Sequence, residues 1–202
     1  MNGACGVCAD CVVSGGMIIT PLAKKGGAGK STVSVLLYEA LRQAGKTVSI
    51  RDWDAQGTSS KALELITGQA NARSDSSQVV IYDTPPSLDH TATATAVRNA
   101  TLVLVVTSPS PADIWEAEEA IQFARSKNPK AHVRVMLNKV RKTTILGKMV
   151  EESVQGLSVT PLPSVLSARE CYQHAIAQGW KALDVAARQE VLQFALHLFS
   201  LK

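Results

Sequence analysis

Five strand-like runs of apolar residues recur along the chain, and each is followed by glycine-rich or polar residues. They cover residues 17–19, 47–52, 79–83, 101–107 and 133–137. Short apolar runs bounded by turn residues are typical of strands in a parallel sheet. Apolar residues at helical spacing predict a helix over 30–44 that ends at Gly45, and a second helix is predicted over 114–127. We therefore predict an α/β fold with a doubly wound, mostly parallel sheet.

The turn between the first strand and the first helix has an unusual composition. It reads Lys24-Lys25-Gly26-Gly27-Ala28-Gly29-Lys30-Ser31-Thr32. Glycines let backbone N–H groups converge on an anion, and the following helix N-terminus adds a partial positive charge. Lys30 is then placed to reach the β- and γ-phosphates of a nucleotide, and Ser31 to offer its hydroxyl to Mg²⁺. The loop is therefore predicted to bind a nucleotide through residues 26–32.

This loop resembles the deviant Walker A motif, K-G-G-x-G-K-[ST], of the ParA/MinD group of P-loop ATPases. In that group an early lysine, here Lys25, reaches across a dimer interface to the nucleotide of the partner subunit. Members related to MinD and to iron–sulfur carriers usually have glycine just before this lysine. Lys24 occupies that position here, which favours the partition-type ParA proteins.

Acidic residues follow two of the predicted strands at the same edge of the sheet. Asp52 and Asp54 follow the second strand, and Asp83 ends the third strand just before Thr84-Pro85-Pro86. A buried strand ending in an acid beside the phosphates predicts that Asp83 holds a Mg²⁺-bound water. The resemblance implies that Asp54 orients the attacking water and that Asp52 supports the Mg²⁺ shell. The simpler alternative is that Asp52 and Asp54 only cap a loop.

The resemblance also assigns roles to later segments. It makes Asn138 a candidate for hydrogen bonding the adenine edge, with residues 157–163 lining the base pocket. The P-S-P-x-D-x-W stretch over 109–115 resembles a loop that helps build the dimer face of short ParA proteins. Asp113 in this stretch is equally expected to be the N-cap of the helix over 114–127.

Positive charge is concentrated in one part of the chain, whose formal net charge is +4. Residues 121–150 contain eight Lys and Arg and no Asp or Glu. Such segregation suits a polyanion, although a basic run is also commonly only a solvated face. The resemblance adds positions toward the C-terminus that contact DNA phosphates in ParA proteins. The DNA-binding candidates are Arg141, Lys142, Lys148, Arg169, Lys181 and Arg188.

The two ends of the chain invite alternative interpretations. Cys5, Cys8 and Cys11 form C-x-x-C-x-x-C within residues 1–16, which we interpret as a disordered extension in preference to a metal site that lacks a nearby fourth ligand. Residues 17–202 are expected to form one ATPase domain. The apolar run over 181–202 has a mixed polar face, which favours a core-covering helix over a membrane-docking one. The absence of a membrane span or secretory h-region predicts a cytoplasmic protein.

The resemblance covers roughly residues 17–180 and implies a ParA-type ATPase that lacks a helix-turn-helix domain. Such a protein binds ATP and Mg²⁺, forms a homodimer around the nucleotide and binds DNA nonspecifically on the nucleoid. A ParB-like or cargo adaptor protein stimulates hydrolysis, and the outcome is positioning of a plasmid, a chromosome region or a protein assembly. The alternatives are an iron–sulfur cluster carrier, a membrane-associated MinD-like regulator, and a metabolic P-loop ligase or kinase.

Overall fold

The computed structural model describes residues 16–68, 77–148 and 150–200. The strands are β1 (Met17–Leu22), β2 (Val48–Asp52), β3 (Val79–Asp83), β4 (Leu102–Thr107), β5 (His132–Val140) and β6 (Pro161–Ser167). The α-helices are α1 (Lys30–Gln43), α2 (Thr58–Thr67), α3 (Thr91–Asn99), α4 (Pro111–Lys127), α5 (Ile145–Lys148), α6 (Val150–Ser153), α7 (Glu170–Gln178) and α8 (Val185–Phe199). A 3₁₀ turn, η1 (Gly179–Ala182), joins α7 to α8.

The strands form a six-stranded sheet in the order β2-β3-β1-β4-β5-β6. Every neighbouring pair is parallel. The strands β2 and β3 lie on one side of β1, and the strands β4 to β6 lie on the other. In such sheets, ligands bind beyond the carboxyl ends of the strands at the point where the strand order reverses. The predicted doubly wound parallel α/β fold is confirmed. The glycine-rich loop of residues 24–32, called the P-loop below, follows the central strand β1.

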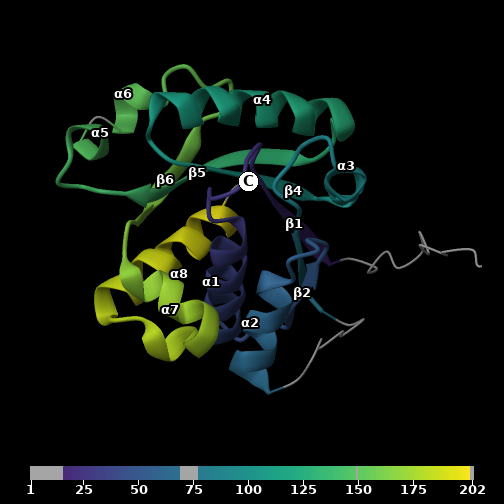
Figure 1. Cartoon of the computed structure of the whole chain (residues 1–202), viewed down its shortest axis with the longest axis vertical. Coiled ribbons are helices and arrows are strands. Elements are labelled where there is room, and N and C mark those ends of the chain that lie inside the picture. The colour runs from purple at the N-terminus through teal and green to yellow at the C-terminus, as the bar shows by residue number, and fades with distance from the viewer. Residues whose placement is uncertain (1–15, 69–76, 149, 201–202) are drawn as a thin grey trace, which may run out of the picture.

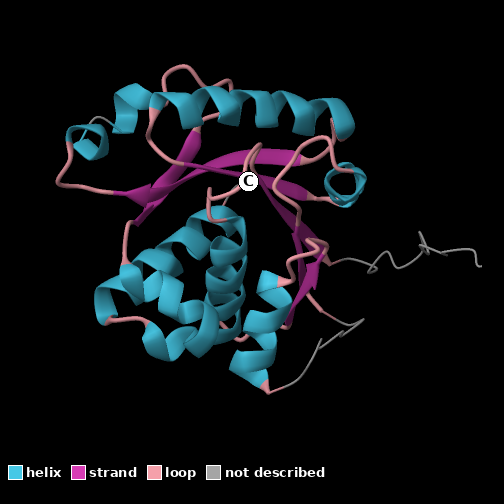
Figure 2. Ribbon diagram, viewed as in Figure 1, coloured by secondary structure: helices cyan, strands magenta, loops and turns pink. Residues whose placement is uncertain are grey.

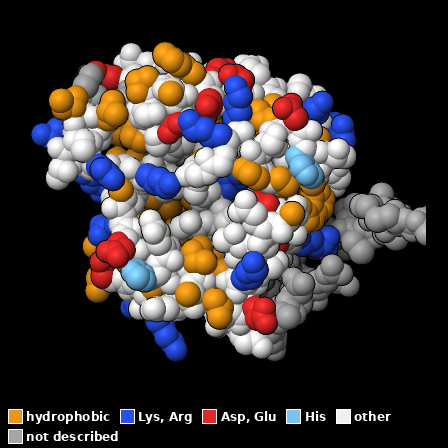
Figure 3. Space-filling model, in the orientation of Figure 1, with side chains coloured by type: hydrophobic (Ala, Val, Ile, Leu, Met, Phe, Trp, Pro, Cys, Tyr) orange, Lys and Arg blue, Asp and Glu red, His pale blue; other side chains and the backbone are white. Residues whose placement is uncertain are grey.

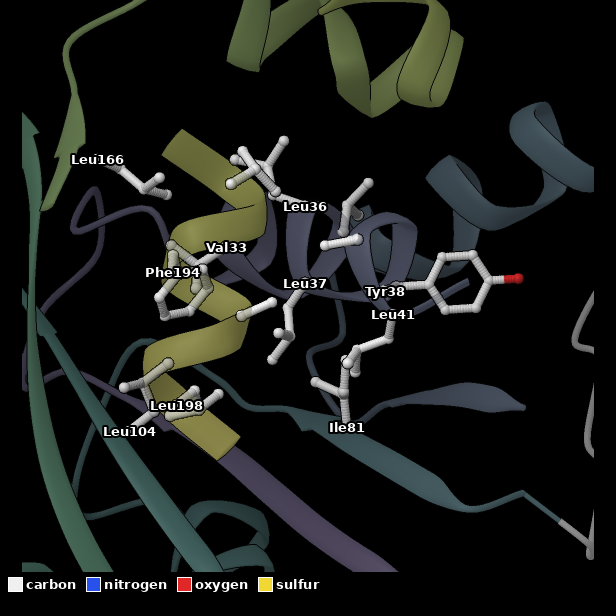
Figure 4. Packing of buried hydrophobic residues seen from close by; sticks show 14 of the residues in the cluster. Val33, Leu36, Leu37, Tyr38, Leu41, Ile81, Leu104, Leu166, Phe194 and Leu198 are labelled. Carbon is white, nitrogen blue, oxygen red and sulfur yellow. The ribbon is translucent and has the colours of Figure 1, made fainter. Parts of the chain in front are cut away.

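Helices cover both faces of the sheet, as Figures 1 and 2 show. Helices α1, α2, α7 and α8 lie on one face, while α3 and α4 lie on the other. Helix α1 is buried over most of its length, and its Leu36 and Leu37 pack with Phe194 and Leu198 of α8 (Figure 4). Full burial of such a side chain stabilises the fold by about 1.5–3 kcal/mol. The core therefore clamps α1, and with it the P-loop, against the sheet.

Helix α8 covers this core, as predicted from its mixed polar face. Asp184 caps it by accepting a hydrogen bond from the Ala187 N–H at 2.7 Å. Its buried face carries Val191 and Phe194 in addition to Leu198. None of the helices in the described ranges is long and apolar enough to cross a membrane.

Two boundaries differ from the sequence-based predictions. Helix α4 begins at Pro111, and its N-cap is Ser110, whose hydroxyl accepts from the Asp113 N–H at 3.3 Å. The prediction that Asp113 is the N-cap is therefore wrong, because Pro111 suits the first helical position. Strand β6 extends to Ser167, so its carboxyl end lies beyond residues 157–163.

Residues 1–15, including the three cysteines of the N-terminal motif, lie outside the described residues.

Candidate functional site

The loop between β1 and α1 has the backbone of an anion cradle. Gly27 and Gly29 adopt φ angles of 83° and 94°, a left-handed conformation that side chains disfavour. Gly29 is the N-cap of α1 and has no side chain to fill the helix N-terminus. The first N–H groups of α1 are thus left to an external acceptor, for which phosphate oxygens are well suited.

Two opposite charges are buried beneath this loop. Asp83 at the end of β3 is fully buried, and Lys30 at the start of α1 is 7% exposed. Burial raises the pKa of Asp83 to about 6, although Ser31, Ser59 and Lys30 favour its charged form. Burial likewise lowers the pKa of Lys30, against the attraction of Asp83 and Asp54. Such perturbed, desolvated groups are typical of functional sites.

The surroundings of Asp83 fit the role expected of it beside a hydrated metal ion. Its Oδ1 atom accepts a long hydrogen bond of 3.5 Å from the Ser34 hydroxyl. Its Oδ2 atom is buried and has no hydrogen-bond partner among the described residues. An unpartnered carboxylate oxygen costs free energy unless a cation or an ordered water satisfies it. Oxygen donors are the ligands that Mg²⁺ prefers, so Asp83 and the neighbouring Ser31 hydroxyl fit this ion.

The two acids after β2 have different surroundings. Both oxygens of Asp52 accept backbone hydrogen bonds, from Asp54 N at 3.0 Å and from Ser60 N at 2.9 Å. Asp52 therefore holds the loop and the first turn of α2, as the capping alternative proposed. Asp54 instead lines a cavity of about 250 Å³ with Lys30, Ser31 and other P-loop residues. The structure thus brings Asp54, but not a free carboxylate of Asp52, to the phosphate side of the loop.

Lys25 makes two ion pairs with α4 in this structure. Its Nζ lies 2.7 Å from Asp113 Oδ1 and 3.1 Å from Glu116 Oε2. These carboxylates raise the pKa of Lys25, with Asp113 the larger cause. The side chain remains half exposed. Lys24 pairs separately with Glu119 at 2.7 Å.

A groove of about 810 Å³ runs from the P-loop past the ends of β4 and β5. Its far wall is formed by residues 167–170 together with Tyr172 and Gln173, where β6 turns into α7. Residues 157–163, which were predicted to line the base pocket, do not line this groove. Residues 157–160 precede β6 and residues 161–163 form its first half, whereas the end of β6 beside the groove is Ser167, which pairs with Val140. Residues 158–163 line a separate cavity.

Asn138 is in the groove wall but is bound to the P-loop. It is 5% exposed, and its Nδ2 donates to the Ala28 carbonyl at 2.9 Å. The next residue, Lys139, donates from Nζ to the Gly27 carbonyl at 2.5 Å. Sequence reasoning missed Lys139, whose orientation depends on a backbone conformation that no local motif indicates.

Comparison with known proteins agrees with this geometry. Residues 19–180 match the family model described as the CobQ/CobB/MinD/ParA nucleotide binding domain. The chain belongs to this family.

Two curated relatives and two solved structures show the range of similarity. The chain is 27% identical to the maintenance of carboxysome distribution protein A of Halothiobacillus neapolitanus, over 81% of this chain and 85% of the relative. The protein of the same name from Gloeobacter kilaueensis is 29% identical, over 83% and 84%. An ATP complex of Cyanothece McdA superposes with a TM-score of 0.73 at 14% identity, covering 93% of this chain and 98% of that one. A putative plasmid partition protein of Borrelia burgdorferi bound to AMPPNP gives 0.72 at 15% identity, covering 92% and 99%.

A second network, also missed by sequence reasoning, closes the far end of the groove in this ParA/MinD-family chain. Glu190 of α8 accepts from Arg169 Nη2 at 3.0 Å, from the Tyr172 hydroxyl at 2.8 Å and from Ser167 N at 3.0 Å. Burial opposes the charge, but these hydrogen bonds outweigh it and lower the pKa of Glu190 to about 2. Glu190 lies 21 positions after Arg169, and no sequence motif links the two residues, so their ion pair could not be predicted from the sequence.

The basic window of residues 121–150 does not form one patch. Strand β5 has nine residues, so its two ends lie about 26 Å apart. Lys127 and Lys130 precede β5. Arg141 and Lys148 follow β5, at the carboxyl edge of the sheet beside the P-loop, which is called the nucleotide edge below. On the side of the molecule drawn in Figure 3, Lys and Arg side chains are spread out and interspersed with acidic ones.

The DNA-binding candidates have different freedom to bind a ligand. Arg141, Lys142, Lys148 and Lys181 are exposed. Arg169 is bound to Glu190, and Lys142 lies 3.5 Å from the same carboxylate. Arg188 is half-buried, donates to the Trp180 carbonyl at 3.3 Å and lies over the Trp180 ring. Within the described ranges, no ion pair or side-chain hydrogen bond competes for Arg141, Lys148 or Lys181.

Proposed function

We propose that this chain is a ParA-type ATPase that binds Mg·ATP, forms a homodimer around it and hydrolyses it to position a cargo. The observation that carries the proposal is the arrangement under the P-loop. A glycine loop with left-handed residues lies over the buried Lys30 and Asp83, and Asp54 and Lys30 line a small cavity beside it. Phosphate binding, metal binding and water activation each have a residue there.

The residues divide the chemistry among them. Lys30 and the N–H groups of residues 26–32 neutralise the phosphates, and Ser31 and Asp83 hold Mg²⁺, partly through water. Bound Mg²⁺ supplies further charge neutralisation on the phosphate oxygens. Asp54 orients a water molecule that attacks the γ-phosphorus, while the bond to the β–γ bridging oxygen breaks to release ADP and phosphate. Lys25 neutralises charge on the partner subunit's nucleotide.

The relatives supply the support for positioning. Two of them, each matched over more than 80% of its length, are named for the maintenance of carboxysome distribution. We therefore favour a protein assembly as cargo over a plasmid or chromosome region. In this scheme an ATP-bound dimer holds nonspecific DNA of the nucleoid, and an adaptor on the cargo stimulates hydrolysis and release.

The test compares the wild type with Lys30→Ala, Asp54→Ala and Lys25→Ala. We expect Lys30→Ala to lose ATP binding and Asp54→Ala to bind ATP but hydrolyse it at least about 100-fold more slowly. Lys25→Ala should bind ATP but neither dimerise nor hydrolyse it. Calorimetry, light scattering with a non-hydrolysable ATP analogue and phosphate release measure these three properties. A wild-type chain that remains monomeric with Mg²⁺ and the analogue would refute the dimer.

A further inference from the structure

The segment Asn138-Lys139 contacts the P-loop from its outer side. Asn138 Nδ2 donates to the carbonyl of Ala28 at 2.9 Å, and Lys139 Nζ donates to the carbonyl of Gly27 at 2.5 Å. A Cβ atom at Gly29 would collide with the Asn138 amide, so this amide is packed directly on the loop. Two successive P-loop carbonyls are therefore held by the end of β5.

These contacts act on the N–H groups that face the anion. In a planar trans peptide unit the C=O and N–H bonds point in opposite directions. Holding the Gly27 and Ala28 carbonyls outward therefore turns the N–H groups of Ala28 and Gly29 toward the inside of the loop. A glycine-rich loop is otherwise free to take many conformations, so fixing two of its peptide planes lowers the entropy lost when phosphate binds.

The backbone of Lys139 supports a dedicated role. Its φ angle is 57°, and it is the only non-glycine residue in the described ranges with a positive φ. The left-handed conformation is unfavourable for lysine and persists only where surrounding contacts enforce it. One such contact is the hydrogen bond from Lys139 N to Asn138 Oδ1 at 2.9 Å. Asn138 thus fixes both the P-loop and the turn that aims Lys139 at it.

We propose that Asn138 and Lys139 are positioning residues that preorganise the P-loop for the triphosphate, whatever base it carries. The inference rests on the proposed function, since it assumes that the loop binds ATP. It gives Asn138 a role other than the predicted contact with adenine, because its amide donates to the Ala28 carbonyl and accepts from the Lys139 N–H, both groups of the protein's own backbone.

The test uses three ligands that differ in the base. Binding of ATP, inosine triphosphate and inorganic tripolyphosphate, each with Mg²⁺, is measured by calorimetry for the wild type, Asn138→Ala and Lys139→Ala. We expect each variant to bind all three ligands about tenfold more weakly, because a charged or buried hydrogen bond is lost behind the loop in every case. A loss confined to ATP would assign base recognition to these residues and overturn the inference.

A glycine variant separates the side chain of Lys139 from its strained backbone. Lys139→Gly relieves the positive φ, so it should melt at a higher temperature than Lys139→Ala while showing the same tenfold loss for all three ligands. Full affinity in Lys139→Gly would show that the ammonium group is not needed. Lys130→Ala, on an exposed turn at the other end of β5, serves as the matched control for loss of a positive charge.

The outcomes also distinguish this inference from the proposed function. A wild-type chain that binds ATP, with variants that bind it equally well, would overturn only the role of Asn138 and Lys139. A wild-type chain that binds no ATP would overturn both.

Discussion

At the scale of single residues, Lys25 already has partners within its own chain. In the single chain its ammonium group contacts Asp113 and Glu116. A lysine that serves the partner subunit's nucleotide must first leave these acids. The ion pairs within the chain therefore compete with the proposed dimer contact.

Glu116→Gln should promote dimerisation by weakening this competition. Exposed ion pairs contribute about 0.2–1 kcal/mol, so we expect the ATP analogue concentration at half-maximal dimerisation to fall by up to about fivefold. Light scattering across a titration of the analogue measures this. Glu119→Gln is the matched control, since Glu119 pairs with Lys24 instead. An unchanged midpoint in Glu116→Gln would show that the acids do not restrain Lys25.

Asp52 and Asp54 should contribute differently to the stability of the fold. Asp52→Ala removes the acceptor of two backbone N–H groups, so we expect the free energy of unfolding to fall by about 1–2 kcal/mol. Asp54→Ala removes one exposed acceptor and should change it by less than about 0.5 kcal/mol. Urea denaturation without nucleotide compares the two. Equal losses would contradict the different roles assigned to these acids.

At the scale of elements, Glu190 ties α8 to the β6–α7 turn that walls the groove. One carboxylate joins Ser167 at the end of β6, Arg169 before α7 and Tyr172 within α7. The shape of the groove wall therefore depends on the packing of α8, which follows the wall residues in the sequence. Helix α8 therefore supports the candidate site through the groove wall and not through a residue of the phosphate-binding loop.

This network should make stability depend on acid pH. The pKa of Glu190 is lowered from 4.5 to about 2, so its contribution is complete above about pH 4.5 and is lost as pH falls toward 2. A shift of this size corresponds to up to about 3 kcal/mol. We expect Glu190→Gln to be less stable than the wild type at pH 7, and the gap to close as pH falls below 4.5. A gap that stays constant down to pH 2.5, in urea denaturation, would contradict this.

At the scale of the whole molecule, the distribution of charge depends on the path of β5. The eight basic residues of one sequence window are divided between opposite edges of the sheet. Lys139, which contacts the P-loop, and the group that follows β5 lie at the edge of the sheet beside the P-loop, where the proposed dimer would bring two copies together. This group is the part of the window that a nucleotide-dependent DNA surface can use.

Removing charge from the two edges should therefore have different effects on DNA binding. We expect the pair Arg141→Ala and Lys148→Ala to weaken ATP-dependent binding to nonspecific duplex DNA and to reduce the slope of log K against log salt by up to about 2. The pair Lys127→Ala and Lys130→Ala removes the same charge from the other edge and should leave binding nearly unchanged. Fluorescence anisotropy over a salt series measures both, and equal effects would refute the edge assignment.

Much of this molecule was predictable because the decisive signals are local. Apolar runs predicted strands that the sheet contains, and the order of strand, glycine loop and helix predicted the phosphate cradle. The acid that ends β3 also needed only its neighbours, since a buried strand that ends in Asp beside a P-loop is typical of a Mg²⁺ site. Local sequence therefore indicated both the fold and the centre of the site.

Tertiary structure alone decided which distant groups meet. It bound the Asn138 amide to the P-loop and gave Asp52 to backbone N–H groups. It also placed residues 167–170, Tyr172 and Gln173 in the groove wall in place of 157–163. It also paired Arg169 with Glu190 and split the basic window. Hydrophobic period and turn chemistry act over a few residues and so are written in the chain, whereas contacts between strand ends depend on register and on backbone angles such as that of Lys139, which only the folded molecule sets.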